Sequence, residues 1–339
     1  MVSLPMFGYV NHILTYNVWN NDFDIIREGR FIDLFKSQLK EENIQLGNLC
    51  IFDCTNEGIG TDVMDDIVQS MNEEFPNTEI RVLFNVVVDR ELTYRYKSFP
   101  QHMVAHCRFL YHVNTLPIDW KEIKIKKHFL SLQRRASVSR IKFTKKLLDN
   151  FDSSQYVLSC ATQPNRWVNE LPIYKEIIKP HRLPILVDGE IDDDRSQHFH
   201  TDESFFSCMF NVITETSSQT DDDSWTEIFI TEKTFKAFAY RQLPIWNGVK
   251  GIVQSVRDLG FDVFDDVINH SYDLIEDEEE RQIQVVNELK RLCNLYPTES
   301  LDNFRRLMWS RISKNMSLLT EIERLHREDK HNLILKLIQ

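Results

Sequence analysis

The stretch Ile228–Trp246, IFITEKTFKAFAYRQLPIW, decides the fold expected for this chain. Its first three residues, Ile228–Ile230, are β-branched and aromatic, which is typical of a buried parallel strand. Thr231 can cap a helix that begins at Glu232, and apolar residues recur along that helix at three- and four-residue spacing. Leu243–Trp246 has the composition of a second strand, with a proline near its start. The stretch therefore predicts a β-α-β unit of a parallel α/β sheet.

A charged pair, Glu232 and Lys233, lies where the predicted helix begins, at the carboxyl end of the first strand. Ligands of open α/β sheets bind at that end. The helix dipole disfavours a lysine there unless an anion is bound, so Thr231 and Lys233 at the helix start predict a phosphate site. Glu232 can accept hydrogen bonds from a ribose diol. An ordinary solvated Glu-Lys pair is the alternative interpretation.

A second informative stretch is Phe129–Leu147, FLSLQRRASVSRIKFTKKL. Lys127–Leu132 predicts a strand, and arginines follow it in the loop and at the start of the next helix. A guanidinium offers fixed donors to a diphosphate and does not lose its proton. Arg140 and Arg135 are therefore candidate donor-binding residues.

Together the two stretches resemble the donor-binding segments of the alpha-1,3-fucosyltransferases and related GT-B glycosyltransferases. Glu232 and Lys233 match the family's Glu-Lys pair, which grips the ribose and the phosphates of the donor. The family also has an arginine followed by an aromatic residue three positions on and by a leucine seven positions on. Arg140, Phe143 and Leu147 match this spacing. The resemblance covers residues 127–273. Within that range, the stretch from residue 260 to residue 264 also resembles viral and phage glycosyltransferase-like proteins.

This resemblance implies an α/β fold of the GT-B type, with two Rossmann-like domains facing each other across a cleft. It implies an inverting, metal-independent enzyme that moves a sugar from a nucleotide-sugar donor to the hydroxyl group of a glycan or small-molecule acceptor. The nucleotide sugar is a co-substrate, and no other cofactor is expected. The expected domains are an acceptor-side domain over residues 1–120, a donor-binding domain over 121–298 and a helical segment over 299–339.

The N-terminal part supports this organisation because predicted strands and helices alternate along it, which is typical of a doubly wound parallel sheet. The predicted strands are His12–Val18, Asn48–Phe52 and Glu79–Val88, and the predicted helices are Ile25–Gln38 and Asp62–Phe75. Further strands are predicted at Gln155–Ser159, Leu183–Val187 and Phe205–Thr214, and a helix at Ile252–Leu259.

Acidic residues at predicted strand ends supply the remaining candidate site residues. The resemblance implies a catalytic base on the N-terminal domain that deprotonates the acceptor. Asp53 and Glu57 follow a predicted strand and are the candidates, with Asp89 as a third, although each is also explained as an ordinary loop acid. Glu215 ends a strongly apolar run, and an acidic residue at that point lies close to the donor in similar proteins.

The composition is typical of a globular protein, and its negative net charge disfavours binding to polyanions. The chain has 339 residues, 42% of them hydrophobic, and a net charge of −12, which disfavours nucleic acid and anionic membranes. Against this background, the dense basic run Lys121–Lys146 suggests a phosphate-bearing ligand. No apolar run approaches the roughly 18–20 residues of a membrane span, and no signal-peptide pattern is present. We therefore expect a soluble protein of the cytoplasm, or of the host cytoplasm if the protein is viral.

Three alternatives remain at this stage. An enzyme that adds sugar to modified bases of phage-type DNA is one, favoured by the basic run and disfavoured by the net charge. A non-catalytic nucleotide-sugar-binding module is the second. The third is a metal-dependent GT-A enzyme, in which the acidic segment Asp192–Asp194 would hold a divalent cation. The scattered cysteines lack paired spacing, so reduced thiols are expected in place of a zinc site.

Overall fold

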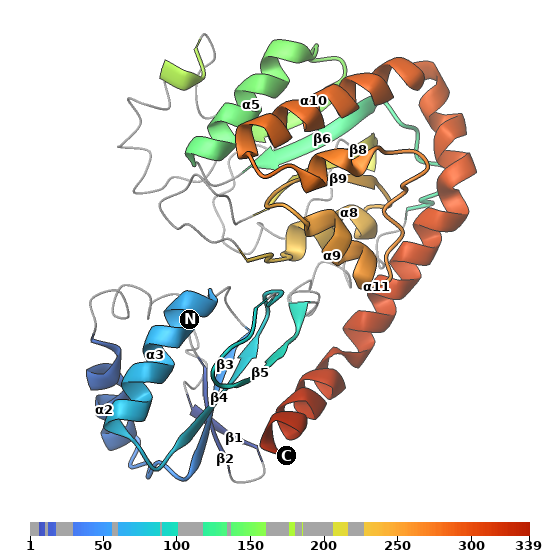
Figure 1. Cartoon of the computed structure of the whole chain (residues 1–339). Coiled ribbons are helices and arrows are strands. Elements are labelled where there is room, and N and C mark those ends of the chain that lie inside the picture. The colour runs from blue at the N-terminus through green and yellow to red at the C-terminus, as the bar shows by residue number, and fades with distance from the viewer. Residues whose placement is uncertain are drawn as a thin grey trace. The chain divides into compact units, whose positions relative to one another are not determined.

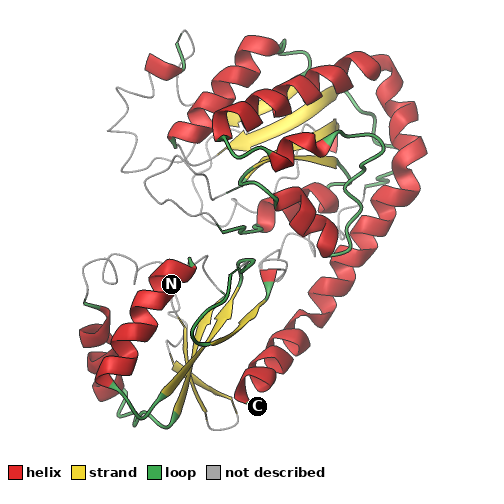
Figure 2. Ribbon diagram, in the orientation of Figure 1, coloured by secondary structure: helices red, strands yellow, loops and turns green. Residues whose placement is uncertain are grey.

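The computed structural model describes residues 7–10, 13–17, 30–55, 60–88, 90–100, 118–133, 137–160, 176–179, 185, 206–215 and 227–339. The chain divides into two compact units. Unit 1 comprises Met1–Ala105, Glu227–Phe229 and Arg324–Gln339, and unit 2 comprises His106–Thr226 and Ile230–Glu323. Each unit contains a sheet with accompanying helices (Figures 1 and 2). The three-part domain division expected from the sequence stays a prediction.

Unit 1 contains a five-stranded sheet in the order β1-β2-β3-β4-β5, in which only the β1–β2 pair is antiparallel. The strands are β1 (Phe7–Val10), β2 (Ile13–Asn17), β3 (Leu49–Cys54), β4 (Glu79–Phe84) and β5 (Arg95–Ser98), and the helices between them are α2 (Phe31–Glu41) and α3 (Thr61–Glu74). The steps β2-α2-β3 and β3-α3-β4 move in the same direction along the sheet. Right-handed crossovers then put both helices on one face, and α2 and α3 do contact each other.

Successive side chains of β3 point to opposite faces of the unit 1 sheet, and both faces are apolar. On one face, Phe52 packs edge-to-face against Tyr16 and against Phe31 and Phe35 of α2, with ring centroids 5.7 to 6.0 Å from that of Phe52. On the other face, Ile51 belongs to a core cluster with Leu83, Phe99 and Ile334. Ile334 comes from the end of α11 (Leu301–Ile338), so the last turns of the chain cover the face that α2 and α3 leave open.

Unit 2 contains an entirely parallel four-stranded sheet in the order β7-β6-β8-β9. The strands are β6 (Lys127–Gln133), β7 (Tyr156–Cys160), β8 (Cys208–Thr214) and β9 (Leu243–Asn247). The described helices are α5 (Val138–Asn150), α8 (Glu232–Ala239), α9 (Ile252–Asp258), α10 (Glu278–Leu295) and the part of α11 up to Glu323, with 3-10 turns η4 (His270–Leu274) and η5 (Thr298–Ser300). Every residue of β8 and β9 is buried, as expected for parallel strands. Pro244 is tolerated because β9 is an edge strand.

The connections of unit 2 create a topological switch point between β6 and β8. From β6 the chain passes through α5 to β7 on one side, and from β8 it passes through α8 to β9 on the other side. Figure 1 shows α5 lying alongside α10, and the two helices are in contact. Neighbouring strands whose connections leave in opposite directions open a crevice at their carboxyl ends, and open α/β sheets bind ligands in such crevices.

The mixed α/β fold with parallel sheets is confirmed, whereas two domains facing each other across a GT-B cleft remain a prediction. The helix after Thr231 and the strand from Leu243 are also confirmed. None of the described helices combines the length and the apolar character needed to cross a membrane. The described cysteines form no disulfide and are buried, and burial raises the pKa of Cys50 to about 12.

One strand prediction is wrong, and a second is correct except at its carboxyl end. Ile228–Ile230 is not a parallel strand, because Ile228 makes an isolated antiparallel bridge with Val87 of unit 1. The strand that precedes α8 in the sheet is β8, which pairs directly with β9. The strand predicted at Glu79–Val88 ends at Phe84, where pairing with β5 ends. Of the strand predicted at Leu183–Val187, only Ile185 is described, in an antiparallel bridge with Cys160.

Candidate functional site

The switch point of unit 2 brings together most of the residues predicted to bind a donor. Arg140 lies in the first turn of α5, just after β6. Glu215 directly follows β8, and Thr231, Glu232 and Lys233 form the cap and first turn of α8. Because β6 and β8 are parallel neighbours, their carboxyl ends lie at the same edge of the sheet. We call these five residues the switch-point cluster.

Glu215 is the centre of this cluster. Its side chain is fully buried, and its carboxylate accepts hydrogen bonds from the backbone N–H of Thr231 (3.2 Å), from the Thr231 hydroxyl and from the Thr234 hydroxyl (2.7 Å). Its backbone carbonyl accepts a hydrogen bond from Nη2 of Arg140 (3.0 Å). One residue therefore holds both the guanidinium that follows β6 and the first turn of the helix that follows β8. Glu215 acts as a positioning residue.

Lys233 is the accessible cation of the cluster, with its side chain 28% exposed. Its Nζ donates to the Thr231 hydroxyl oxygen (3.1 Å), and lies 3.7 Å from Oε1 of Glu232 and 3.9 Å from Oε2 of Glu215. The two carboxylates are thus at the outer limit of ion pairing, so they orient the ammonium group without making short contacts to it. The Thr231 oxygen also caps α8 by accepting from the backbone N–H of Lys233 (3.3 Å).

Arg140 is buried, with 7% of the residue exposed. Its backbone N–H donates to Ser137, the residue that caps α5 (3.3 Å). Arg140 is the third residue of the helix, so its guanidinium lies near the positive end of the α5 dipole. A cation at that position is unfavourable unless an anion is also present. The same holds for Lys233 in the first turn of α8.

A chain of hydrogen bonds from β9 completes the cluster, and the sequence reasoning missed it. Nε1 of the buried Trp246 donates to the Thr234 hydroxyl (3.0 Å), which in turn donates to Glu215. The tryptophan of the Leu-Pro-Ile-Trp segment thus orients the threonine that holds the carboxylate. The sequence did contain a signal for this arrangement. Thr231 and Thr234 are three residues apart, so their hydroxyl groups lie on one face of the helix and can contact the same partner.

Of the predicted catalytic carboxylates, only Asp53 lies among the described residues. Asp53 is the last residue but one of β3 in unit 1, where its carboxylate accepts hydrogen bonds from the backbone N–H (3.1 Å) and the hydroxyl (2.5 Å) of Thr55. This is a local turn contact. Glu57, Asp89 and Arg135 lie outside the described residues, so their roles stay predictions.

The described part of the chain contains no evident metal site. Among those residues no group of three or more His, Cys, Asp or Glu side chains is arranged to hold an ion. Asp192–Asp194, the segment behind the GT-A alternative, lies outside the described residues.

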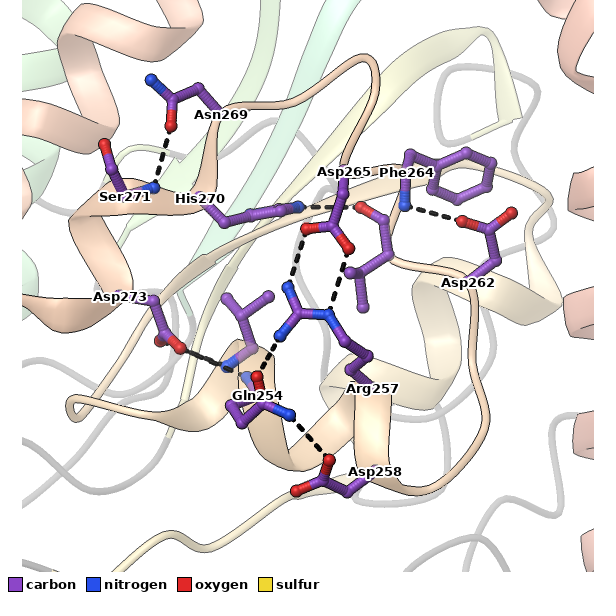
Figure 3. A network of polar contacts seen from close by, with 12 residues as sticks. Gln254, Arg257, Asp258, Asp262, Phe264, Asp265, Asn269, His270, Ser271 and Asp273 are labelled. Atoms are coloured by element: carbon purple, nitrogen blue, oxygen red, sulfur yellow. Dashed lines mark hydrogen bonds and ion pairs between the residues drawn. The ribbon is translucent and has the colours of Figure 1, made fainter.

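A separate cavity in unit 2, of about 730 Å³, is lined mainly by residues between Gln254 and Leu274. Figure 3 shows that its polar groups contact one another. Arg257 forms a two-pronged ion pair with Asp265, with N–O distances of 3.0 and 2.7 Å. The Asp273 carboxylate accepts from the first N–H groups of α9, which follows Gly251 at a φ of 83°. These pairings stabilise the segment, so this cavity is a weaker candidate than the switch-point cluster.

A smaller cavity, of about 590 Å³, borders the first turn of α5 and is lined mostly by acidic residues at the start of α10. Acidic side chains at a helix start are favourable for the helix dipole without any ligand. Neither cavity is lined by Arg140 or Lys233. The switch-point cluster is therefore identified by its topology and its charges.

Comparison with protein-family models, with curated proteins and with solved structures finds no match to this chain. The function must therefore be argued from the residues of the switch-point cluster.

Proposed function

We propose that unit 2 binds the diphosphate of a nucleotide sugar at the carboxyl ends of β6 and β8, and that the protein transfers the sugar to an acceptor hydroxyl. One observation carries this proposal. Two cationic side chains from separate segments meet around Glu215 at a topological switch point: Arg140 donates to its backbone carbonyl, and the Lys233 ammonium lies 3.9 Å from its carboxylate. Phosphate-bearing ligands are the expected occupants of such a crevice.

The charges of the cluster suit a diphosphate. A guanidinium binds phosphate oxygens through fixed, paired donors, whereas an ammonium acts as a compact point charge. The α5 and α8 helices both begin at this edge of the sheet, and their positive ends add to the two side chains. A bound anion would relieve the unfavourable placement of both cations. Glu232, 22% exposed at its side chain, is proposed to accept hydrogen bonds from ribose.

The same two cations have a role in the transfer step. Negative charge builds on the leaving nucleoside diphosphate as the bond to the sugar breaks, and Arg140 and Lys233 would stabilise that charge as preorganised groups. A carboxylate must take the proton of the acceptor hydroxyl. Asp53 and Glu57 remain the proposed bases, and the reaction is proposed to invert the configuration of the sugar.

Binding is tested by calorimetry with inorganic pyrophosphate, GDP-fucose and UDP-glucose on the wild type, Lys233→Ala and Lys236→Ala. Lys236 is the matched control, because it lies in the last turn of the same helix. Hydrogen bonds to charged groups contribute about 1.5–3 kcal/mol, so Lys233→Ala should weaken binding at least about tenfold. Lys236→Ala should change it less than about twofold. Equal affinities for all three proteins would contradict the proposal.

Transfer is tested separately by following donor consumption with and without added acceptors. Donor hydrolysis or transfer that falls with Lys233→Ala supports an enzyme. Tight donor binding with no turnover under any condition would instead favour the non-catalytic binding module.

A further inference from the structure

The switch-point edge carries two buried oxygen atoms without a partner among the described residues, and a diphosphate cannot satisfy one of them, the amide oxygen of Gln133. We propose that Gln133 and Thr214 accept hydrogen bonds from sugar hydroxyl groups of the bound ligand, and so select a phosphate ester that carries hydroxyls over a bare phosphate. This inference rests on the proposed function, because it assigns a second part of the same ligand to the same edge of the sheet.

Gln133 ends β6, and Thr214 ends β8. Only 1% of Gln133 and 6% of Thr214 are exposed. Oε1 of Gln133 and Oγ1 of Thr214 have no hydrogen-bond partner in the part of the chain that the structure describes. The Gln133 amide is anchored on its other side, where Nε2 donates to the Ser131 hydroxyl (3.3 Å). Buried polar atoms are rarely left unpaired, and those that are call for a functional or structural reason.

The sheet register places these two residues together. Phe129 pairs with Phe210, and Leu130 pairs with Asn211. Continuing this register for three residues puts Gln133 beside Thr214, with both side chains on one face of the sheet. Thr214 immediately precedes Glu215, whose carbonyl accepts from Arg140. The two oxygens therefore end the same pair of strands that brings the cations together.

The chemistry of the two atoms restricts what can meet them. An amide oxygen accepts hydrogen bonds and cannot donate them, whereas a hydroxyl can do both. Diphosphate oxygens are ionised at neutral pH and also only accept, so they cannot satisfy Gln133. Hydroxyl groups can. A site with cations for the phosphates and acceptors for the hydroxyls discriminates strongly against ligands that lack the hydroxyls, because its buried polar groups would then stay unpaired.

The test uses the full chain with three variants, Gln133→Leu, Thr214→Val and Gln155→Leu. Gln155 is the control because it precedes β7, at the opposite edge of the same sheet, and its amide contacts a local turn. Affinities for GDP-fucose, UDP-glucose and inorganic pyrophosphate are measured by calorimetry, and melting temperatures confirm folding. Gln133→Leu and Thr214→Val should each weaken binding of the preferred nucleotide sugar about tenfold. Their affinity for pyrophosphate should stay within about twofold of wild type, and Gln155→Leu should change neither affinity.

Each other outcome has a distinct meaning. A parallel loss of pyrophosphate and nucleotide-sugar binding would show that the substitutions disturb the cation cluster, and would overturn the inference. Unchanged nucleotide-sugar affinity in both variants, or a wild type that binds pyrophosphate but neither nucleotide sugar, would also overturn it while leaving the anion site standing. A wild type that binds none of the three ligands would overturn the proposed function and the inference together.

Discussion

Glu215 organises the switch-point cluster through its own hydrogen bonds. Its carboxylate is occupied by the two threonines of the α8 start, and its carbonyl by Arg140. A buried carboxylate with this many donors is strongly held, since charge-assisted hydrogen bonds are short and directional. The first turn of α8 and the Arg140 side chain are therefore positioned by the protein before any ligand binds.

Thr234→Val tests this positioning at the level of a single hydroxyl. The substitution keeps the shape of a fully buried side chain but removes the group between Trp246 and Glu215. Leaving buried partners unpaired should lower the free energy of unfolding by about 1–3 kcal/mol, measured by urea denaturation. Donor affinity should fall as well. Thr320→Val is the control, because that hydroxyl only contacts a carbonyl of its own helix. Equal stability of both variants would contradict the positioning role.

Among the elements, the sequence predicts α8 and β9 correctly because their signals are local. Thr231 is a helix cap, the apolar residues of α8 repeat at helical spacing, and Pro244 is compatible with an edge strand. Ile228–Ile230 has the composition of a strand but bridges to Val87. Strand pairing is a tertiary contact, and three apolar residues carry no information about their partner.

The packing of the end of α11 on the unit 1 sheet can be tested by substitution. Ile334 packs with Ile51, Leu83 and Phe99 on the face of the unit 1 sheet opposite the aromatic cluster. Ile334→Ala should destabilise unit 1 by about 2–4 kcal/mol through lost apolar contact and a residual cavity. Leu307→Ala on the same helix is the control, since Leu307 is 76% exposed, and it should cost less than about 0.5 kcal/mol. Chemical denaturation checks both values. Similar losses would contradict the assigned packing.

At the scale of the whole molecule, the net charge of −12 bears on binding to polyanions such as DNA, whereas the cation pair Arg140 and Lys233 bears only on the local site. The overall charge disfavours binding to DNA, and several lysines of the basic run already have partners. Lys145 pairs with Asp149 (2.5 Å), and Lys127 donates to the backbone carbonyls of Ser153 (2.6 Å) and Tyr156 (2.7 Å). This weakens the DNA-modifying alternative, because the run does not present a continuous set of unpaired cations.

The architecture also limits what the sequence could reveal of the site. Arg140 and Lys233 were predicted individually, from helix starts and from spacing. Their shared contact with Glu215 depends on β6 and β8 being neighbours, which follows from the strand order. The lack of partners for Gln133 and Thr214 among the described residues is likewise a tertiary property, because the sequence does not show which donors lie beside them.

Hydrogen–deuterium exchange with and without a nucleotide sugar tests the central claim most directly. With GDP-fucose or UDP-glucose bound, we predict slower exchange in residues 137–140 and residues 231–234 together. We predict unchanged exchange in residues 254–274, which include the network of polar contacts drawn in Figure 3. Protection confined to residues 254–274, or present at only one of the two helix starts, would contradict a single diphosphate site at the switch point of unit 2.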